Sequence, residues 1–491
     1  HKEVENAINE GQITLCNYDI YHELVVYGKQ DVIILQKLYE AVNIISQDLF
    51  SCNIYDFITA SSMAFYGFAQ HVPKQVLLKT NKKQRTLNIF RLNKKEEDFV
   101  RSAVYGGRTI PRIHEWVSSD IGKANYNEIE DYYVYLDISG MYVAAMKEQA
   151  YPIGSHNWLT SELDQEQLDE LAMKLNTNRF TKATLPFFIA EVDIVFNVND
   201  LEPSSPYRQI HPSSKTPLLM WGVERQEQSV YSSVLLQRLC RNGARIVKMK
   251  RCMLWSAQSK IFEKWMDFTL NVKNSGGSAK RKFGKILGNG TYGSMMKHDH
   301  SEVVRIVETQ EQMDKFHRLF EWTDLIPAFK KMIIKGKPLN EDKKDVLCSR
   351  PIFLAVFILD YTKCMVDDFI QKLMPNRFNV NGIFEQPLYG DTDSLVVHAS
   401  LLKNVEELLG KENGFWSDEL LDAWDYPTRT FGKIVEWIGT APKSYGLQYR
   451  LPTDNVLHSK VKFKGIPRSG ISFEWKGSMA HEITLDILRE C

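Results

Sequence analysis

Two apolar segments that end in carboxylates, about 250 residues apart, most constrain how this 491-residue chain folds. DYYVYLDI (131–138) is a continuous apolar run closed by Asp137, a pattern typical of a buried strand. EQPLYGDTDSLVVH (385–398) predicts a strand, a tight turn and a second strand, with Asp391 and Asp393 in the turn. A buried carboxylate is costly unless it is paired or binds metal, so we expect the three aspartates to meet around divalent cations. Hard oxygen ligands beside phosphates favour Mg²⁺.

A third segment, KRKFGKILGNGTYGSMMK (280–297), contains a GxGxxG pattern formed by Gly288, Gly290 and Gly293. A dinucleotide-binding fingerprint needs these glycines between a strand and a helix. Here they come late in a helical pattern that we expect to begin at Ser278 as its N-cap. A protein kinase would also need HRD and DFG strings, and the sequence contains neither. Both of those nucleotide-binding classes are therefore excluded.

One face of that predicted helix suits a triphosphate. Steps of four, four and three residues place on one side Arg281, Lys285, Asn289 and Tyr292. Cations match the charge of a triphosphate, and an aromatic ring can stack on a base or a sugar. Taken alone, the basic run at 280–282 is more simply interpreted as a solvated charged face. Taken alone, Asp391 and Asp393 are more simply interpreted as part of an ordinary turn. The combination with Asp137 favours a site.

The overall charge conceals local basic stretches. The formal net charge is zero, yet residues 245–300 hold twelve Lys or Arg against three Asp or Glu, and residues 74–112 hold eleven against three. Such a chain can present basic channels to nucleic acid without being basic overall. The seven cysteines form no CxxC pair, which argues against a zinc site or a disulfide framework and fits a reducing intracellular setting.

Two further features concern the chain as a whole. The most apolar run, IFLAVFILDYTKCMVDDFI (352–370), is interrupted by Asp360, Lys363, Asp367 and Asp368, so it predicts a buried helix and no membrane span. The chain starts at His1 and shows no signal peptide, and we expect it to be a fragment that lacks its upstream part. Residues 20–50 and 350–374 predict long helices, and residues 186–196 predict a strand.

These motifs resemble those of the protein-primed branch of family B DNA polymerases. Three segments occur in the order of the family's motifs. DISGMY (137–142) is similar to motif A, KILGNGTYG (285–293) is similar to the Kx₃NSxYG motif B, and YGDTDS (389–394) is similar to motif C. Weaker similarities are YGKQD (27–31) to the third exonuclease motif, PKSY (442–445) to the KxY element, and KFKGIP (462–467) to the start of a thumb. YPIG (151–154) and the long gaps between motifs resemble adenovirus-type, mobile-element and bacteriophage members.

The resemblance implies a role for each matching residue. Catalytic carboxylates would be Asp137, Asp391 and Asp393, with two Mg²⁺ ions (Mn²⁺ as the alternative) on Asp137, the Ile138 carbonyl and Asp393. The incoming nucleotide would meet Gly140, Met141, Tyr142 as a steric gate, Lys273, Arg281, Lys285, Asn289 and Tyr292. Primer and template DNA would meet Gly106, Gly107, Lys443, Tyr445, Lys462 and Lys464. An exonuclease remnant would retain Tyr27 and Asp31.

The sequence departs from the family pattern at several positions. Gly290 replaces the usual Ser of motif B, and Val143 replaces the Pro that often follows motif A. In VYGG, Val104 stands where the YxGG element has its Tyr, and we expect the neighbouring Tyr105 to substitute for stacking. No first or second exonuclease motif fits in the residues before Asp31, so proofreading cannot be complete in this chain.

The resemblance implies an α+β fold, a right-hand polymerase of palm, fingers and thumb with a remnant of an RNase H-like 3′–5′ exonuclease domain. We expect an exonuclease remnant at 1–60, a connector with the VYGG element at 61–130, a first palm part at 131–257 with an insertion at about 155–245, fingers at 258–295, a second insertion at 296–348, a second palm part with the catalytic hairpin at 349–430, and a thumb at 431–491.

The function that follows is template-directed DNA synthesis, in which dNMP passes from a dNTP to a primer hydroxyl of DNA or of a terminal protein. The expected partners are DNA template and primer, dNTP and a terminal protein, and no membrane is expected to be involved. The expected location is the intracellular site where a linear viral or mobile-element genome is replicated. Two alternatives are an inactive polymerase-like DNA-binding scaffold and a nuclease fragment. The clustered carboxylates speak against the scaffold, and the missing exonuclease carboxylates speak against the nuclease.

Overall fold

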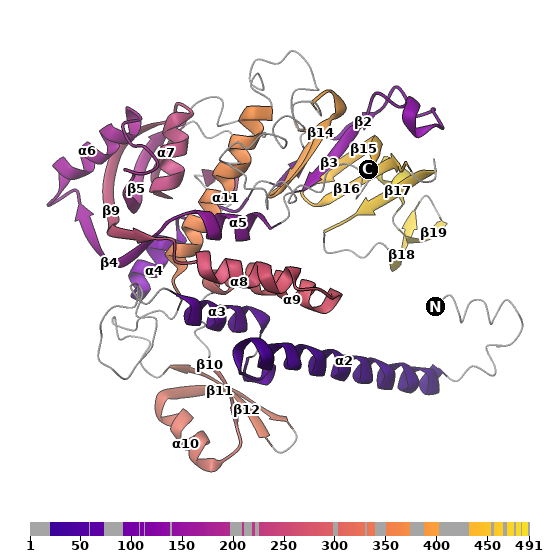
Figure 1. The fold of residues 1–491 in the computed structure, drawn as a ribbon, viewed down its shortest axis with the longest axis horizontal. Helices are drawn as coiled ribbons and strands as arrows, with labels where there is room; N and C mark the ends of the chain where they lie inside the picture. The colour runs from indigo at the N-terminus through magenta and orange to yellow at the C-terminus, as the bar shows by residue number, and fades with distance from the viewer. Residues whose placement is uncertain are drawn as a thin grey trace, which may run out of the picture.

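The structure is a computed structural model. It describes residues 20–57, 59–72, 92–107, 109–111, 113–137, 140–196, 209–210, 219–220, 225–297, 303–328, 331–338, 350–373, 387–401, 432–452, 456–464, 469–475, 478–482 and 484–489. Helices and mostly antiparallel strands are mixed along the chain (Figure 1). Across these ranges, no helix combines the length and the apolar character that a bilayer crossing requires.

A central eight-stranded sheet carries the carboxylate motifs. Its strands in spatial order are β1 (Thr109–Pro111), β13 (Tyr389–Asp391), β14 (Ser394–His398), β3 (Tyr133–Asp137), β15 (Lys433–Ala441), β16 (Ser444–Arg450) and β17 (Leu457–Lys462), and β2 (Glu115–Val117) pairs with β15. Side chains of β3 alternate between two cores, because Tyr133 packs in one while Val134 and Leu136 pack in the other. The predicted buried strand is therefore confirmed, with both of its faces covered.

Two helices cover one face of this sheet. The short α5 (Met141–Glu148) follows β3 directly, and the long α11 (Ile352–Leu373) precedes the β13–β14 hairpin. Their apolar side chains, among them Met141, Ala145 and Val366, share a core with β3 and with Leu395 of β14. The start of α5 is set by Gly140, whose φ of 84° lies in the left-handed region that favours glycine. The predicted buried helix over 350–374 is confirmed.

A helical layer of α3 (Ala60–His71), α8 (Glu263–Asn274) and α9 (Ser278–Met296) lies below the sheet in Figure 1. Glycines of α9 allow its close packing. A Cβ at Gly284 would lie 2.6 Å from the Lys273 backbone N, and one at Gly288 would lie 2.7 Å from Val143 Cγ2. A Cβ at Gly290 would lie 3.3 Å from Ala64 Cβ. Close packing of α9 thus accounts for the glycine pattern, and the predicted helix is confirmed. Its N-cap residue is Gly277 and not Ser278 as predicted.

The first predicted insertion is a separate four-stranded sheet covered by helices. Its strands in spatial order are β4 (Tyr151–Thr160), β9 (Arg245–Ser259), β5 (Phe187–Val195) and β8 (Arg225–Ser232), with α6 (Gln165–Asn176) and α7 (Ser233–Arg241) packed on it. The limits expected for this insertion, near 155 and 245, fall within β4 and at the start of β9, and they stay predictions. The pairing of β4 with β9 extends to Tyr151 and Ser259, so the unit includes both strands in full.

The second predicted insertion folds as a small module of its own, at the bottom of Figure 1. It contains β10 (Val303–Val307), α10 (Gln310–Leu319), β11 (Phe320–Ala328) and β12 (Lys331–Pro338), with β12 in the middle of the sheet. The mixed-charge segment KKMIIKGKPLNEDKKD (330–345), within this insertion, is expected from its sequence to be loop-like. That expectation is wrong for Lys331–Pro338, because this stretch pairs with strands on both sides; residues 339–345 lie outside the described part.

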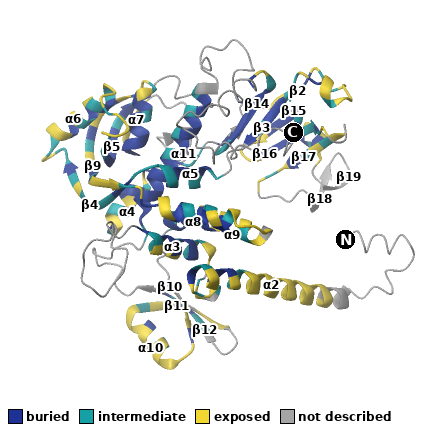
Figure 2. Ribbon diagram, viewed as in Figure 1, coloured by how far each residue is buried: buried dark blue, intermediate teal, exposed yellow. Residues whose placement is uncertain are grey.

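The N-terminal helix α2 (Ile20–Phe50) has the predicted bounds. Figure 2 shows it exposed over most of its length, and the buried residues Ile45 and Phe50 lie near its C-terminal end. Smaller elements complete the fold: η1 (Ile54–Asp56), α4 (Lys94–Arg101), η2 (Tyr126–Glu128), β6 (Gln209–Ile210), β7 (Leu219–Met220), η5 (Ala399–Leu401), β18 (Ser469–Trp475), β19 (Ser478–Glu482) and α14 (Leu485–Arg489).

The central sheet continues past the predicted boundary between palm and thumb at 430/431. Strand β15 pairs with β3, and β16 and β17 continue the same sheet beyond it. Strands β15 to β17 are therefore part of the sheet that carries the β13–β14 hairpin. The domain boundaries stay predictions.

Candidate active site

The hairpin of β13 and β14 places the carboxylate turn beside the end of β3. Ser394 pairs with Asp137 across β14 and β3, and with Asp391 across the hairpin. Asp391 is thus the last residue of a strand, and only Thr392 and Asp393 form the turn, which corrects the prediction that both aspartates lie in it. The Asp137 side chain and all of Ile138 lie outside the described residues. The strand register nevertheless places the backbones of the three motif aspartates at one end of the sheet, and the meeting of their carboxylates around metal ions stays a prediction.

Asp391 is held by two other segments. The Lys443 ammonium lies 2.9 Å from Oδ1 and 3.0 Å from Oδ2 of Asp391. The Thr109 hydroxyl donates a hydrogen bond of 3.0 Å to Oδ1, because β1 pairs with β13 at this residue. Lys443 sits in the turn between β15 and β16 with a φ of 63°, a left-handed conformation that is uncommon for a non-glycine residue. Both carboxylate oxygens of Asp391 are therefore already engaged.

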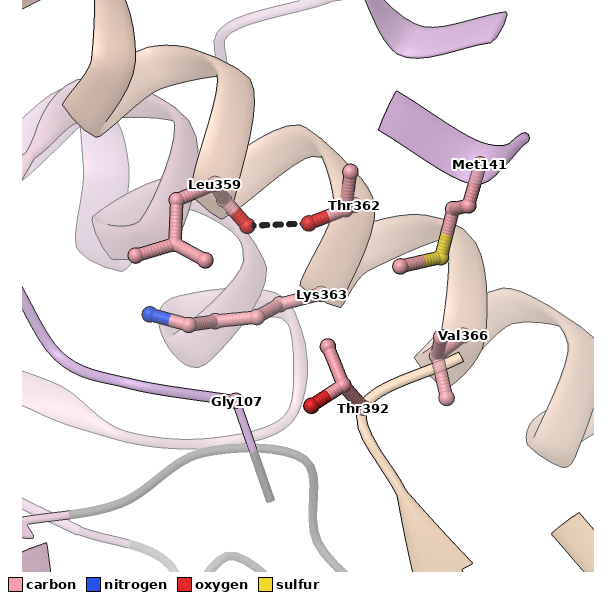
Figure 3. Close-up of a pocket in the computed structure, with 7 residues that line it drawn as sticks. All are labelled: Gly107, Met141, Leu359, Thr362, Lys363, Val366 and Thr392. Atoms are coloured by element: carbon pink, nitrogen blue, oxygen red, sulfur yellow. Dashed lines mark hydrogen bonds between the residues drawn. The ribbon is translucent and has the colours of Figure 1, made fainter. Parts of the chain in front are cut away.

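The glycine pair before β1 packs against the carboxylate turn. A Cβ on Gly107 would lie 2.8 Å from Cγ2 and 2.9 Å from Oγ1 of Thr392, so only glycine allows this approach. Thr392 itself has a φ of 58°. Behind the two residues lies a cavity of about 10 Å³, which α11 borders with Leu359, Thr362, Lys363 and Val366 and α5 with Met141 (Figure 3).

Two tyrosines from different motifs meet next to the turn. Tyr142, in the first turn of α5, and Tyr292, on α9, have ring centroids 4.5 Å apart. Burial, with the charge of Asp393 as a smaller cause, raises the pKa of Tyr142 to about 12. Burial also raises the pKa of Tyr292. The hydroxyls are therefore neutral at physiological pH, and residues of all three motifs lie close together.

The face of α9 that was predicted to be cationic is exposed. Arg281, Lys285 and Asn289 lie on its solvent side, Tyr292 is half-buried, and Phe283 and Leu287 pack inward. Lys273, in the last turn of α8, is half-buried, and a Cβ at Gly284 of α9 would meet its backbone. The predicted helical register is confirmed, and it brings basic side chains and an amide onto one surface.

The predicted DNA-contacting residues differ in their exposure. Lys462 and Lys464 are exposed, and the Lys462 ammonium lies 5.8 Å from the ring centroid of Tyr445. Tyr445 itself is 3% exposed and stacks on Trp437, so its ring has little surface left for a primer. Gly106 is half-buried beside Gly107.

Two further expectations concern tyrosines. Tyr105 was expected to replace the missing stacking residue of the YxGG element, and this expectation is wrong. It is 1% exposed and stacks on Tyr231 of β8, with centroids 4.8 Å apart, so its ring cannot reach a nucleic acid. Tyr27 and Asp31 lie exposed on α2, and their role as an exonuclease remnant stays a prediction.

Sequence patterns did not indicate that Thr109 and Lys363 lie beside the carboxylate turn. Thr109 bonds to a carboxylate 282 residues further along the chain, and nothing in its own surroundings signals that partner. Lys363 was noticed only as a charge within an apolar run. No group of three or more His, Cys, Asp or Glu that could hold a metal gathers among the described side chains, which do not include that of Asp137.

The comparison with protein families agrees with this geometry. Residues 1–374 match the family described as DNA polymerase type B, organellar and viral. The chain belongs to this family. The predicted family B assignment is thereby confirmed. The match includes motif A and motif B and ends one residue after α11.

A curated DNA polymerase of Kluyveromyces lactis is 22% identical over 397 residues, which cover 77% of this chain and 33% of that protein. The chain thus spans about a third of the length of this relative. Phi29 DNA polymerase complexed with primer-template DNA shares the fold, with a TM-score of 0.56 at 14% identity over 95% of this chain and 72% of the other. The complex of the same polymerase with primer-template DNA and incoming nucleotides gives a TM-score of 0.53 at 14% identity, over 84% of this chain and 61% of the other chain. The predicted right-hand polymerase fold is confirmed by this likeness.

Proposed function

We propose that this chain is the polymerising part of a template-directed DNA polymerase, which transfers dNMP from a dNTP to a primer hydroxyl. The observation that carries the proposal is the meeting of β3, β13 and β14 at one end of the sheet, where Ser394, directly after Asp393, pairs with both Asp137 and Asp391. Family membership supports the reaction, and neither the scaffold nor the nuclease alternative explains a carboxylate turn that adjoins a basic helix face.

The oxygen donors at this edge suit divalent metal ions, on which family B polymerases generally depend. Asp137, the Ile138 carbonyl and Asp393 would hold two Mg²⁺ ions, with Mn²⁺ as the alternative. When bound, such ions lower the pKa of an attacking hydroxyl and stabilise the charge on a leaving pyrophosphate. Asp391 takes a different role in this proposal, because Lys443 and Thr109 already engage its carboxylate. It orients Lys443 towards the primer end.

The other residues bind and orient the substrates. Lys285 and Arg281 on α9 meet the triphosphate together with Lys273, and their exposure leaves them accessible to it. Tyr142 lies against Tyr292 beneath the sugar, where its ring would exclude a 2′-hydroxyl. The basic side chains Lys462 and Lys464 contact the duplex phosphates, which strengthens binding without reading sequence. Asn289 and Tyr292 border the nascent pair, whereas the Met141 side chain, which follows Gly140, is 1% exposed and packs in the core.

The deciding experiment is primer extension by the Asp393→Asn variant. The change keeps the side-chain shape and removes the charge, so Mg²⁺-dependent extension should fall by at least about a hundredfold while affinity for primer-template DNA stays within about twofold. Asp486→Asn is the matched control, because Asp486 lies exposed on α14. Extension by Asp393→Asn at the rate of the control would refute the proposal.

We also propose that synthesis can start on a hydroxyl of a terminal protein, at the intracellular site where a linear viral or mobile-element genome is replicated. Supporting this, the module of β10 to β12 exposes large apolar side chains, among them Ile306, Leu319 and Trp322, which are 55–60% exposed. Apolar surface of this kind is typical of protein contacts. A protein hydroxyl can replace a DNA 3′-hydroxyl at the same metals, so no catalytic residue needs to change.

A further inference from the structure

A buried ion pair lies within α11, close behind the carboxylate turn. The Lys363 ammonium is 3.0 Å from Oδ1 of Asp360, and the two side chains are 3% and 0% exposed. Burial raises the pKa of Asp360, and Lys363 opposes that shift. Removing two charges from water is costly, and apolar residues would fill the same space at least as stably. The pair therefore needs an explanation other than stability.

The pair is anchored from the first insertion. Ser232, at the end of β8, donates a hydrogen bond of 2.7 Å from its hydroxyl to Oδ2 of Asp360. The same hydroxyl accepts from the backbone N–H of Leu235 and so caps α7. Ser232 is itself 0% exposed. One hydroxyl thus ties the start of a helix in the insertion to a carboxylate in the palm helix.

The other end of the pair reaches the carboxylate turn. Lys363 borders the cavity of about 10 Å³ together with Gly107 and Thr392. Figure 3 shows the Lys363 side chain extended between Leu359 on one side and Gly107 and Thr392 on the other. Its methylene stem forms a wall of the cavity, and its ammonium lies 5.8 Å from the ring centroid of Tyr105, two residues before Gly107.

Thr392 needs support of this kind. Its φ of 58° is unfavourable for a β-branched residue, and such a conformation persists only where the surroundings enforce it. Gly107 borders Thr392 on one side and the α11 wall lies behind it. The turn carries Asp393, whose backbone N–H bonds to the Asp391 carbonyl at 2.7 Å. A shift of Thr392 would move both aspartates.

We propose that Ser232, Asp360 and Lys363 are positioning residues that hold the carboxylate turn in its catalytic geometry. Ser232 fixes Asp360, Asp360 fixes the ammonium of Lys363, and the stem of Lys363 supports Gly107 and Thr392. The insertion is thereby linked to the catalytic turn through side chains that are buried as far as Lys363 and then through the half-buried Gly107 and Thr392. The inference rests on the proposed polymerase function and adds residues that none of the three motifs contains.

The test compares two double variants that leave no unpaired charge. Asp360→Asn with Lys363→Met keeps a stem of similar length, whereas Asp360→Asn with Lys363→Ala removes it. The Met variant should extend a primer about threefold more slowly than the wild type in single turnovers, because its stem remains but is no longer tethered to Asp360. The Ala variant should be slower by at least about tenfold, with dNTP affinity within about twofold, because misplacement of a reacting group lowers the rate of the chemical step. Hydrogen exchange at the Asp393 amide should be faster in the Ala variant alone.

Leu354→Ala is the matched control, since it opens a cavity in the same helix nine residues away at a side chain that is 1% exposed. It should leave the single-turnover rate unchanged at a temperature where all variants are folded. Ser232→Ala should slow extension and Ser232→Thr should restore it, because Thr retains the hydroxyl. Equal rates for the Met and Ala variants, or an equal loss in Leu354→Ala, would overturn the inference. A wild-type chain that does not extend primers would instead contradict the proposed function.

Discussion

The two aspartates of motif C have different surroundings at the residue scale. The Asp391 side chain is 13% exposed and is engaged by an ammonium and a hydroxyl. Asp393 lies in the turn itself, where its charge helps to raise the pKa of the buried Tyr142. Because both oxygens of Asp391 already have partners, binding a metal would require Asp391 to give them up. This geometry supports the proposal that Asp391 positions Lys443 and that Asp393 is the metal ligand of motif C.

The ion pair between Asp391 and Lys443 should act as one unit. Asp391→Asn and Lys443→Met should each slow single-turnover extension by roughly tenfold, and the double variant should be no slower than the slower single variant, because contacting residues are non-additive. Lys464→Met is the control: it lies exposed on the same surface and should only weaken DNA binding, with an effect that adds to that of Asp391→Asn. Additive losses for Asp391 and Lys443 would contradict the pairing.

Tyr142 should control the choice of sugar through its ring. Tyr142→Val should raise ribonucleotide incorporation relative to dNTP by at least about tenfold, since space opens where a 2′-hydroxyl would lie. Tyr142→Phe should keep the wild-type preference. Because the pKa of the phenol is raised to about 12, it stays protonated throughout pH 6–9, so the preference should not change over that range. Competition between rNTP and dNTP measures all three, and an unchanged ratio in Tyr142→Val would assign the gate to another residue.

At the scale of elements, the site depends on close contacts between segments that are short or rich in glycine. Strand β1 has three residues, yet it supplies Thr109 to Asp391 and follows the glycine that contacts Thr392. On α9, Gly284 and Gly288 set the distances to α8 and α5, and so position the basic face relative to Tyr142. Element contacts of this kind are sensitive to a single methyl group.

Gly107→Ala should therefore disturb the turn more than the fold. The added Cβ would lie 2.8 Å from Thr392, and overpacking of this kind costs about 1–3 kcal/mol. Extension should fall by at least about tenfold while the thermal unfolding midpoint drops by only a few degrees. Gly122→Ala is the control, because nothing lies within 4 Å of a Cβ there. A Gly107→Ala enzyme as active as Gly122→Ala would show that the turn tolerates displacement.

At the scale of the whole molecule, the second module of β10, α10, β11 and β12 has a core of its own. Its own small core contains Val307, Phe316 and Ile334, separate from the cores around the sheet. In the chain, this module is inserted between α9 and α11. A unit with its own core can be removed without exposing another one.

Replacing residues 300–345 by a short Gly/Ser linker should spare addition of a single nucleotide to an annealed primer. It should reduce product length in strand displacement and the transfer of dNMP to a terminal protein by about tenfold or more, because the exposed apolar surface of the module is lost. Single-turnover extension on a short primer-template serves as the internal control. Unchanged product length and unchanged protein nucleotidylation would remove the support for protein priming and leave the family B assignment intact.

The sequence by itself determined the local elements around the site and the residue types in them. Hydrophobic periodicity predicted α2, α11 and the exposed face of α9, and the apolar run before Asp137 predicted a strand with both faces buried. These features depend on neighbours a few residues apart, which periodicity reports directly. The motif spacing also identified the family.

Only the tertiary structure decided which residues touch across the chain. The partners of Asp391 are 52 and 282 residues away, and they are selected by strand register. The burial of Tyr105 against Tyr231, the link from Ser232 to Asp360, and the continuation of the sheet through β17 likewise depend on packing between distant segments. Local pattern carries no information about such contacts, because the free energy that fixes them comes from burial and pairing that exist only once the sheet and its helices have assembled.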